Sequence, residues 1–282
     1  MITKNSMQLK AFIKKKAAEK HITEQLVLQN YMLERLLERI TLTKYQKNFI
    51  LKGGFLIGAI VGLDARTTMD LDATIKGLEL SHKTLRLVFE EICRVSLYDN
   101  VTFEISGIED IRESDDYPGI RVGLKADYPP ISVPLFVDVT TGDIITPGAI
   151  DYKLNLMFDD RSIQVFAYNL ETLLAEKLET VISRNIANTR SRDFYDIYIL
   201  HHLYEKSLSS EILKKAIEET ATKRGSLPAI REYGKVMQDI AASERMNGFW
   251  NKYQKDYSYA GAIKFNDICI LIIDILDGLA FY

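Results

Sequence analysis

The feature that most constrains the fold of this sequence is an apolar, glycine-rich segment followed directly by an alternating one. Residues 49–63, FILKGGFLIGAIVGL, carry Gly53 and Gly54 ahead of a helix-like apolar run. Residues 64–75, DARTTMDLDATI, end in alternating apolar and polar residues, which is the pattern of a strand with one buried face. The two segments predict a turn, an apolar helix and a strand in that order.

Two aspartates lie in the alternating segment. Asp70 and Asp72 flank Leu71, so in a strand both carboxylates would project from the same face, opposite Leu71 and Ala73. Like charges beside each other on a sheet are unfavourable unless a cation lies between them, and oxygen ligands suit Mg²⁺ or Mn²⁺. The alternative is an edge strand that ends in solvated acids.

A third carboxylate comes from a later segment of the chain. Asp138 interrupts the apolar run of PLFVDVTTG, residues 134–142, at what should be the interior of a strand. Three carboxylates on neighbouring strands can hold two metal ions, which activate an attacking hydroxyl and bind a triphosphate. Asp70, Asp72 and Asp138 are therefore the expected metal ligands.

The glycine pair is a candidate phosphate site. Exposed backbone amides at the start of a helix can bind phosphates, although two glycines before a helix also make tight turns. What favours nucleotide binding is the order of a glycine pair, a helix, Arg66 and then Asp-x-Asp. The candidate nucleotide-binding residues are Lys52, Gly53, Gly54 and Arg66.

The rest of the chain divides into two regions. Residues 7–40 and 81–97 have helical periodicity, with Thr23 and Glu24 starting a second helix and Ser81 as a cap. Residues 101–139 contain three strand-like segments, and beyond about residue 169 the pattern is helical almost to the end. We expect an α+β fold with a mixed sheet over residues 1–168, followed by a helical bundle domain over residues 169–282.

One lysine falls on the apolar side of a predicted helix in the second region. Lys177 shares the buried stripe of a helix that begins near Leu170. An inward lysine needs a partner: it could pair with Asp193 or Glu171, bind a triphosphate as a point charge, or snorkel at the edge of the stripe. Asp196 stands four residues after Arg192, which is the spacing of a helix-surface pair.

Composition excludes several classes of protein. The chain has 282 residues, no run of the roughly 18–20 apolar residues needed to span a membrane, and no secretion signal at its lysine-rich start. Its two cysteines form no CxxC pair, which argues against zinc and a disulfide framework. We expect a cytoplasmic protein. The net charge of -3 is not typical of a nucleic-acid binder, but Arg184, Arg190 and Arg192 could form a local basic surface or a solvated one.

Three motifs carry a resemblance to a known family. KGGFLIGAIVGLDARTTMDLD resembles the glycine-pair and Asp-x-Asp signature of polymerase β-like nucleotidyltransferases. Together with FVDVTTGD and LETLLAEKLETVISRNIANTRSRDFYDIYIL, it is similar to the AbiEii/AbiGii toxin family, which is related to the MenT toxins. The resemblance covers roughly residues 49–200. Many nucleotidyltransferases have Gly-Ser where this chain has Gly53-Gly54, so nucleotide binding there would rest on backbone amides.

The resemblance implies a function and a set of roles. It implies a polymerase β-like nucleotidyltransferase fold, and a toxin of an AbiE-like type IV toxin–antitoxin or abortive phage infection system. Such a toxin would use Mg²⁺ or Mn²⁺ to transfer a nucleotide from an NTP to an RNA acceptor, with tRNA 3′ ends as the acceptor that the relatives imply. Lys177 and Asp193 match active-site residues of the family, and a cognate AbiEi-like antitoxin is expected to be encoded nearby.

Two alternatives stay open from the sequence. Kinase-like phosphoryl transfer would use the same metals and lysine. A nucleotide-binding module without catalysis would keep the fold, but a decayed site would be expected to lose acids, and all the candidate acids are present.

Overall fold

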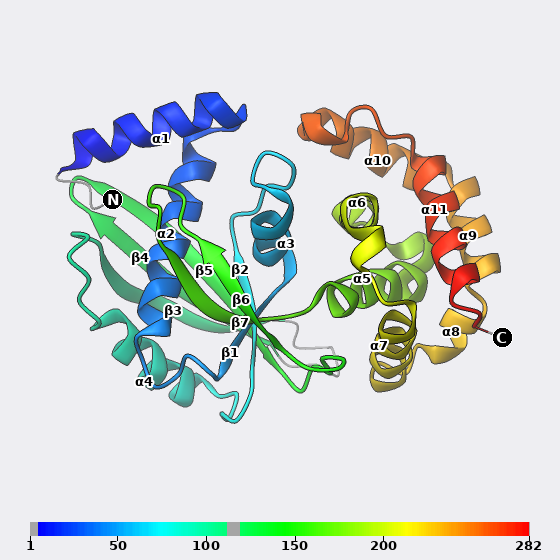
Figure 1. Ribbon diagram of the computed structural model, residues 1–282, viewed down its shortest axis with the longest axis horizontal. Helices are drawn as coiled ribbons and strands as arrows, with labels where there is room; N and C mark the ends of the chain where they lie inside the picture. The colour runs from blue at the N-terminus through cyan, green and yellow to red at the C-terminus, as the bar shows by residue number, and fades with distance from the viewer. Residues whose placement is uncertain (1–4, 112–118, 282) are drawn as a thin grey trace. The chain divides into compact units, whose positions relative to one another are not determined.

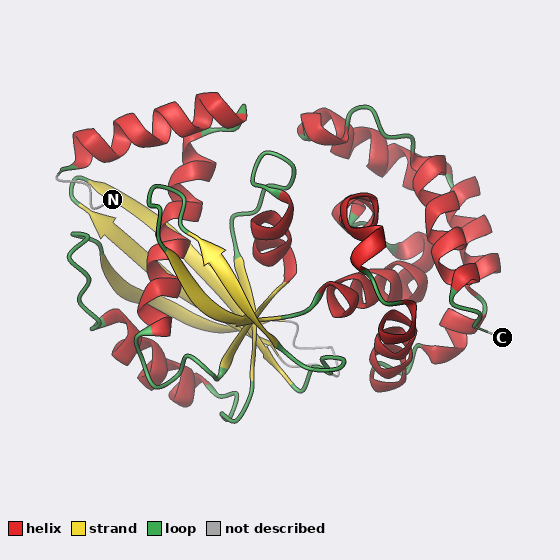
Figure 2. Ribbon diagram, viewed as in Figure 1, coloured by secondary structure: helices red, strands yellow, loops and turns green. Residues whose placement is uncertain are grey.

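The chain forms two compact units in a computed structural model that describes residues 5–111 and 119–281. The first unit contains residues 1–143 and 150–167, and the second contains residues 144–149 and 168–282. The first is built from a sheet and helices and the second from helices (Figure 1, Figure 2). The division into residues 1–168 and 169–282 as independent domains stays a prediction.

A mixed sheet organises the first unit, as the sequence predicts. Its seven strands have the order β3-β4-β5-β2-β1-β7-β6, with β2–β5 and β1–β7 parallel and the other neighbours antiparallel. The strands are β1 (Phe49–Lys52), β2 (Leu71–Ile75), β3 (Thr102–Ile111), β4 (Gly119–Tyr128), β5 (Ile131–Thr141), β6 (Ile150–Asn155) and β7 (Ser162–Ala167).

Four helices accompany this sheet: α1 (Ser6–Lys20), α2 (Glu24–Thr41), α3 (Gly53–Val61) and α4 (His82–Cys93). The Thr23 hydroxyl accepts a hydrogen bond from the Leu26 amide and the Ser81 hydroxyl accepts one from the Thr84 amide, so both predicted helix starts are confirmed. Helix α2 packs against β5 and β7, and α4 packs against β3 (Figure 1).

Helix α2 is buried on nearly every side, which a single apolar stripe does not predict. Its charged residues are buried because they have partners. The Arg39 guanidinium donates to both carboxylate oxygens of Asp99 at 2.9 and 2.8 Å, and Glu38 accepts from Arg161 at 2.8 Å. A buried charge is tolerated only when it is paired and hydrogen-bonded, so these contacts fix how α2 packs on the sheet.

The entry to β2 differs from the predicted strand. The strand begins at Leu71, so Asp70 lies just before it. The side-chain amides of Gln29 and Asn30 on α2 donate to the carbonyls of Met69 (3.1 Å) and Thr68 (2.9 Å). Because these two carbonyls bond to side chains of α2, the hydrogen bonds between β2 and its neighbouring strands begin only after residue 69.

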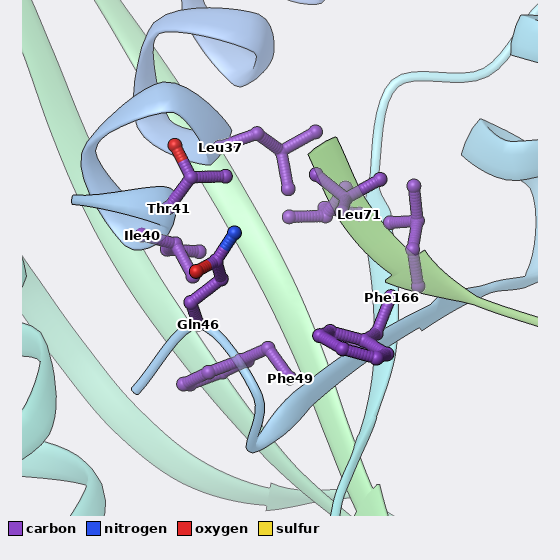
Figure 3. A pocket seen from close by; sticks show the side chains of 10 residues that line it. Leu37, Ile40, Thr41, Gln46, Phe49, Leu71 and Phe166 are labelled. Carbon is purple, nitrogen blue, oxygen red and sulfur yellow. The ribbon is translucent and has the colours of Figure 1, made fainter. Parts of the chain in front are cut away.

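A small apolar cavity of about 20 Å³ lies between α2 and the sheet (Figure 3). Leu37 lines it from the helix, and Phe49, Leu71 and Phe166 line it from the strands. Leu71 alternates with Asp72 along β2, so the cavity is on the face opposite to the Asp72 side chain. Apart from Thr41 and Gln46, its lining side chains are apolar, so it contains none of the candidate charged residues.

The second unit is helical, as predicted. Its helices are α5 (Leu170–Arg184), α6 (Ser191–Tyr204), α7 (Ser210–Lys223), α8 (Leu227–Arg231), α9 (Tyr233–Ala242), α10 (Glu244–Asp256) and α11 (Phe265–Gly278). They enclose one apolar core that contains Trp250. Residues 144–149 join this unit because Asn169, the cap of α5, donates to the Thr146 carbonyl at 2.7 Å.

The described helices include none that is both long and apolar enough to cross a membrane.

Burial of Glu34 on α2 predicts a pH dependence of stability. Its carboxylate accepts a hydrogen bond from the Met157 amide at 2.9 Å, yet desolvation raises its pKa to about 7 from 4.5. The unfolded chain releases this proton near pH 4.5 and the native state near pH 7, so stability falls as pH rises through that window. Between pH 4.5 and pH 8, we expect the free energy of unfolding of E34Q to rise by about 3 kcal/mol relative to that of the wild-type protein. Urea unfolding followed by circular dichroism at both pH values checks this, and a pH-independent difference would contradict it.

Candidate active site

Four charged side chains form one row across four neighbouring strands of the first unit. Lys52 at the end of β1 lies opposite Asp72 of β2. Asp72 lies opposite Asp138 of β5, and Asp138 lies opposite Arg121 of β4. Residues opposite each other on neighbouring strands project from the same face, about 5 Å apart. This charged row (Lys52, Asp72, Asp138, Arg121) therefore places two acids side by side with a base at each end.

The glycine pair allows the backbone to approach Asp72 closely. The Gly54 amide, at the start of α3, donates to Asp72 Oδ2 at 3.1 Å. Gly53 has a φ of 63°, and a Cβ at this position would lie 2.3 Å from Asp72 Oδ2. Only glycine fits there, both for its backbone angle and for this contact. The positive end of α3 thus faces a carboxylate of the protein itself.

Lys52 forms an ion pair with Asp143, which the sequence analysis does not predict as a site residue. Its Nζ lies 2.6 Å from Asp143 Oδ2, and the Thr140 hydroxyl donates to the same carboxylate at 2.8 Å. Burial opposes ionisation of Asp143, but the charge and hydrogen bond of Lys52, with hydrogen bonds from Thr140 and Thr74, outweigh it and lower the pKa. The clue in the sequence is the second acid of FVDVTTGD. Phosphate binding by Lys52 stays a prediction.

Arg121 is the second residue that sequence reasoning missed. Its Nε and Nη2 donate to Asp138 Oδ1 and Oδ2 at 2.7 and 2.8 Å, and its guanidinium lies 5.2 Å from the centre of the Phe136 ring. The hydrogen bonds to Asp138 raise the pKa of Arg121, and the charges of Asp138 and Asp70 add to this effect. The clue in the sequence is a basic residue on the polar side of the alternating segment GIRVGLKADY.

Arg66 adjoins the start of α3. It is buried, its guanidinium donates to the Thr67 carbonyl, and a Cβ at Gly54 would lie 3.3 Å from its Nη2. The structure thus brings Arg66 to Gly54, and nucleotide binding by Arg66 stays a prediction.

A second charged cluster lies within the helical unit. Lys177 Nζ lies 2.7 Å from Asp193 Oδ1 and 2.9 Å from Asp196 Oδ2, and the three side chains are 11%, 1% and 0% exposed. The sequence suggests Asp193 or Glu171 as a partner for Lys177, and the structure shows the pair with Asp193. Glu171 instead accepts a hydrogen bond from the Ser209 amide at 3.0 Å, and Arg192 is exposed. The Lys177 cluster (Lys177, Asp193, Asp196) joins α5 to α6.

Comparison with known proteins decides the family. The sequence profile described as "Nucleotidyl transferase AbiEii toxin, Type IV TA system" matches residues 35–268. The chain belongs to the AbiEii family. It is a nucleotidyltransferase toxin of a type IV toxin–antitoxin system. An AbiEii nucleotidyltransferase has an NTP as substrate, and a type IV toxin has a cognate antitoxin.

One solved structure supports the fold of this AbiEii chain. JHP933 from Helicobacter pylori superposes with a TM-score of 0.50 at 14% identity, over 91% of this chain and 94% of that chain. A second Helicobacter pylori protein, described as a candidate nucleotidyltransferase, has a TM-score of 0.48 at 15% identity, over 92% of this chain and 99% of that one. No curated protein sequence matches the chain.

The donor set on the sheet fits a divalent cation held by two carboxylates. Mg²⁺ is usually bound by one or two protein carboxylates together with substrate phosphates and waters. Asp72 and Asp138 are such a pair. Within residues 5–111 and 119–281, no group of three or more His, Cys, Asp or Glu side chains could hold a metal ion. The three-carboxylate set with Asp70 as a metal ligand stays a prediction.

Replacement of Lys177 should damage folding as well as any catalysis. We expect K177A to lower the free energy of unfolding of the helical unit by about 3–5 kcal/mol, because two buried carboxylates lose the ammonium of Lys177, although Asp193 keeps Arg190 at 2.9 Å. Urea unfolding followed by fluorescence measures this, since the single tryptophan, Trp250, is buried in that unit.

A matched control for this variant is K215A. Lys215 is 63% exposed and lies 3.8 Å from Glu219, so its removal should change stability by less than about 0.5 kcal/mol. Equal stability of K177A and K215A would show that Lys177 is not needed for folding.

Proposed function

We propose that this AbiEii nucleotidyltransferase transfers a nucleotide from an NTP to the 3′ end of an RNA, with tRNA as the acceptor. We further propose that Mg²⁺ or Mn²⁺ is bound by Asp72 and Asp138, with Asp70 as an additional ligand. The observation that carries this proposal is the alignment of Asp72 with Asp138 in the charged row. The RNA acceptor comes from the resemblance to the toxin families.

The reaction forms a bond between the acceptor hydroxyl oxygen and the α-phosphorus of the NTP. The bond from the α-phosphorus to the bridging oxygen breaks, and pyrophosphate leaves. A divalent cation at the row would neutralise the triphosphate and favour loss of the hydroxyl proton. Asp138 is the proposed acceptor of that proton, and Asp72 is held in place by the Gly54 amide.

Other residues are proposed to bind the triphosphate. Lys52, Arg66 and the backbone of Gly53 and Gly54 lie around Asp72 in the first unit. A planar guanidinium such as that of Arg66 suits phosphate oxygens.

Lys177 and Asp193 stay proposed catalytic residues. The family motif supports this role, with Asp193 orienting the ammonium of Lys177. Their contacts within the helical unit also support a structural role, which the stability of K177A measures separately.

For the partner, we propose an AbiEi-like antitoxin encoded nearby. Kinase-like transfer of the γ-phosphoryl group is the alternative within enzymes, because the same carboxylates and cation would serve it. A non-catalytic nucleotide-binding module is disfavoured because all the candidate carboxylates are present.

Labelled nucleotides distinguish these reactions. The purified protein is incubated with total tRNA, Mg²⁺ and each NTP in turn, labelled at the α- or the γ-phosphate. We expect α-label to enter RNA and γ-label to leave as pyrophosphate. D72N should lower the rate by at least about a hundredfold, because loss of one group that stabilises the transition state commonly has an effect of that size.

The control variant is D127N. Asp127 lies on β4 and pairs with Lys125 at 2.8 Å, away from the charged row, so its loss should leave transfer intact. Label from γ-labelled NTP in RNA would identify a kinase instead. No label from either position in any RNA, with NTP still bound, would identify a binding module.

A further inference from the structure

Arg121 occupies the position beside Asp138 where a cation would bind. Its two nitrogens take both carboxylate oxygens of Asp138, at 2.7 and 2.8 Å. The forked guanidinium takes one lone pair of each Asp138 oxygen, so a metal ion has fewer free lone pairs at Asp138 while Arg121 is bound and meets a positive charge there. The structure thus contains an internal cation where the proposed function requires an external one.

The pair is accessible enough to exchange. The side chains of Arg121 and Asp138 are 31% and 20% exposed, unlike the Lys177 cluster, whose acids are almost fully buried. Partial exposure lets water and salt screen this pair, which lowers the free-energy cost of breaking it. Breaking this pair is therefore compatible with an intact fold.

The guanidinium also contacts an aromatic ring, which would remain beside it if it left Asp138. Phe136 precedes Asp138 by two residues on β5, and its ring is 37% exposed below the Arg121 guanidinium. The residue opposite Phe136 on β4 is Gly123, which has no side chain to compete with Arg121 for the ring. A cation stays favourable over an aromatic face after it leaves a carboxylate.

The other contacts of the row involve Lys52 and the start of α3. Lys52 binds Asp143, and Asp72 accepts its hydrogen bond from the neutral Gly54 amide. Asp72 and Asp138 lie opposite each other on parallel strands, where two like charges repel. Arg121 is the cation seen to reduce this repulsion at Asp138.

We propose that Arg121 and a divalent cation compete for Asp138. Without the cation, Arg121 neutralises Asp138 and keeps the two acids compatible with the fold. When a cation binds Asp72 and Asp138, the guanidinium leaves Asp138 and keeps its contact with the Phe136 ring. Arg121 thereby raises the metal concentration at which the site fills, and this inference rests on the proposed cation site.

Affinity for Mn²⁺ alone tests the competition. Calorimetric titration without NTP or RNA should show R121A binding Mn²⁺ at least about fivefold more tightly than the native protein. R121K should be intermediate, because a lysine keeps the charge but cannot bind both oxygens at once. K125A removes a base from the same strand that pairs with Asp127, so it should change affinity by less than about twofold. Unchanged or weaker binding by R121A would overturn the proposal.

A second measurement uses the native protein and does not depend on the folding of a variant. The Nε–H group of Arg121, identified by its loss in R121K, is followed by nuclear magnetic resonance during titration with Mg²⁺. We expect its signal to shift or exchange with water as Mg²⁺ saturates. An unchanged signal at saturation would overturn the proposal.

These results are independent of the reaction. Competition for Mn²⁺ without any nucleotide transfer would support the role of Arg121 and contradict the proposed function. Nucleotide transfer together with an undisturbed Arg121–Asp138 pair would support the proposed function and contradict the role of Arg121.

Discussion

Two carboxylates side by side on neighbouring parallel strands are the constraint on which the rest of the candidate site depends. Asp72 and Asp138 lie opposite each other, an unfavourable pairing without compensation. The protein compensates from each side, with the Gly54 amide at Asp72 and the Arg121 guanidinium at Asp138. The first of these contacts requires a glycine at position 53, because a Cβ would collide with the Asp72 carboxylate. The glycine pair and Arg121 thus each stabilise one of the two carboxylates.

The sequence predicts the Asp72–Asp138 pair better than it predicts the residues around that pair. Alternation along residues 64–75 singles out Asp72, and the interruption of an apolar run singles out Asp138. The strand-like and helical patterns suffice for a mixed sheet and a helical region. Asp70 lies outside β2 because α2 takes up the backbone carbonyls before it. Arg121 and Asp143 escape prediction because their partners depend on strand register, which alternation leaves open. No strand is predicted for β6 and β7, since six alternating residues are a weak pattern.

Buried charges elsewhere follow a different rule. Lys177 is held by two almost fully buried acids within the helical unit, and Arg39 is held by Asp99 within the first unit. Removing one member of such a group leaves an uncompensated charge, so loss of activity after mutation of Lys177 does not by itself identify a catalytic group. The charged row differs because Arg121 and Asp138 are partly exposed. Their exposure leaves the Arg121–Asp138 pair open to exchange with a bound ion.

The most direct test of the account is the position of a bound cation. Crystals grown with Mn²⁺ and a non-hydrolysable NTP analogue would locate the metal by its anomalous scattering. The account predicts a metal bonded to both Asp72 and Asp138 at roughly 2 Å, with triphosphate oxygens completing its coordination and Arg121 displaced from Asp138. A metal bound away from Asp138, with the Arg121–Asp138 pair intact in the presence of nucleotide, would contradict it.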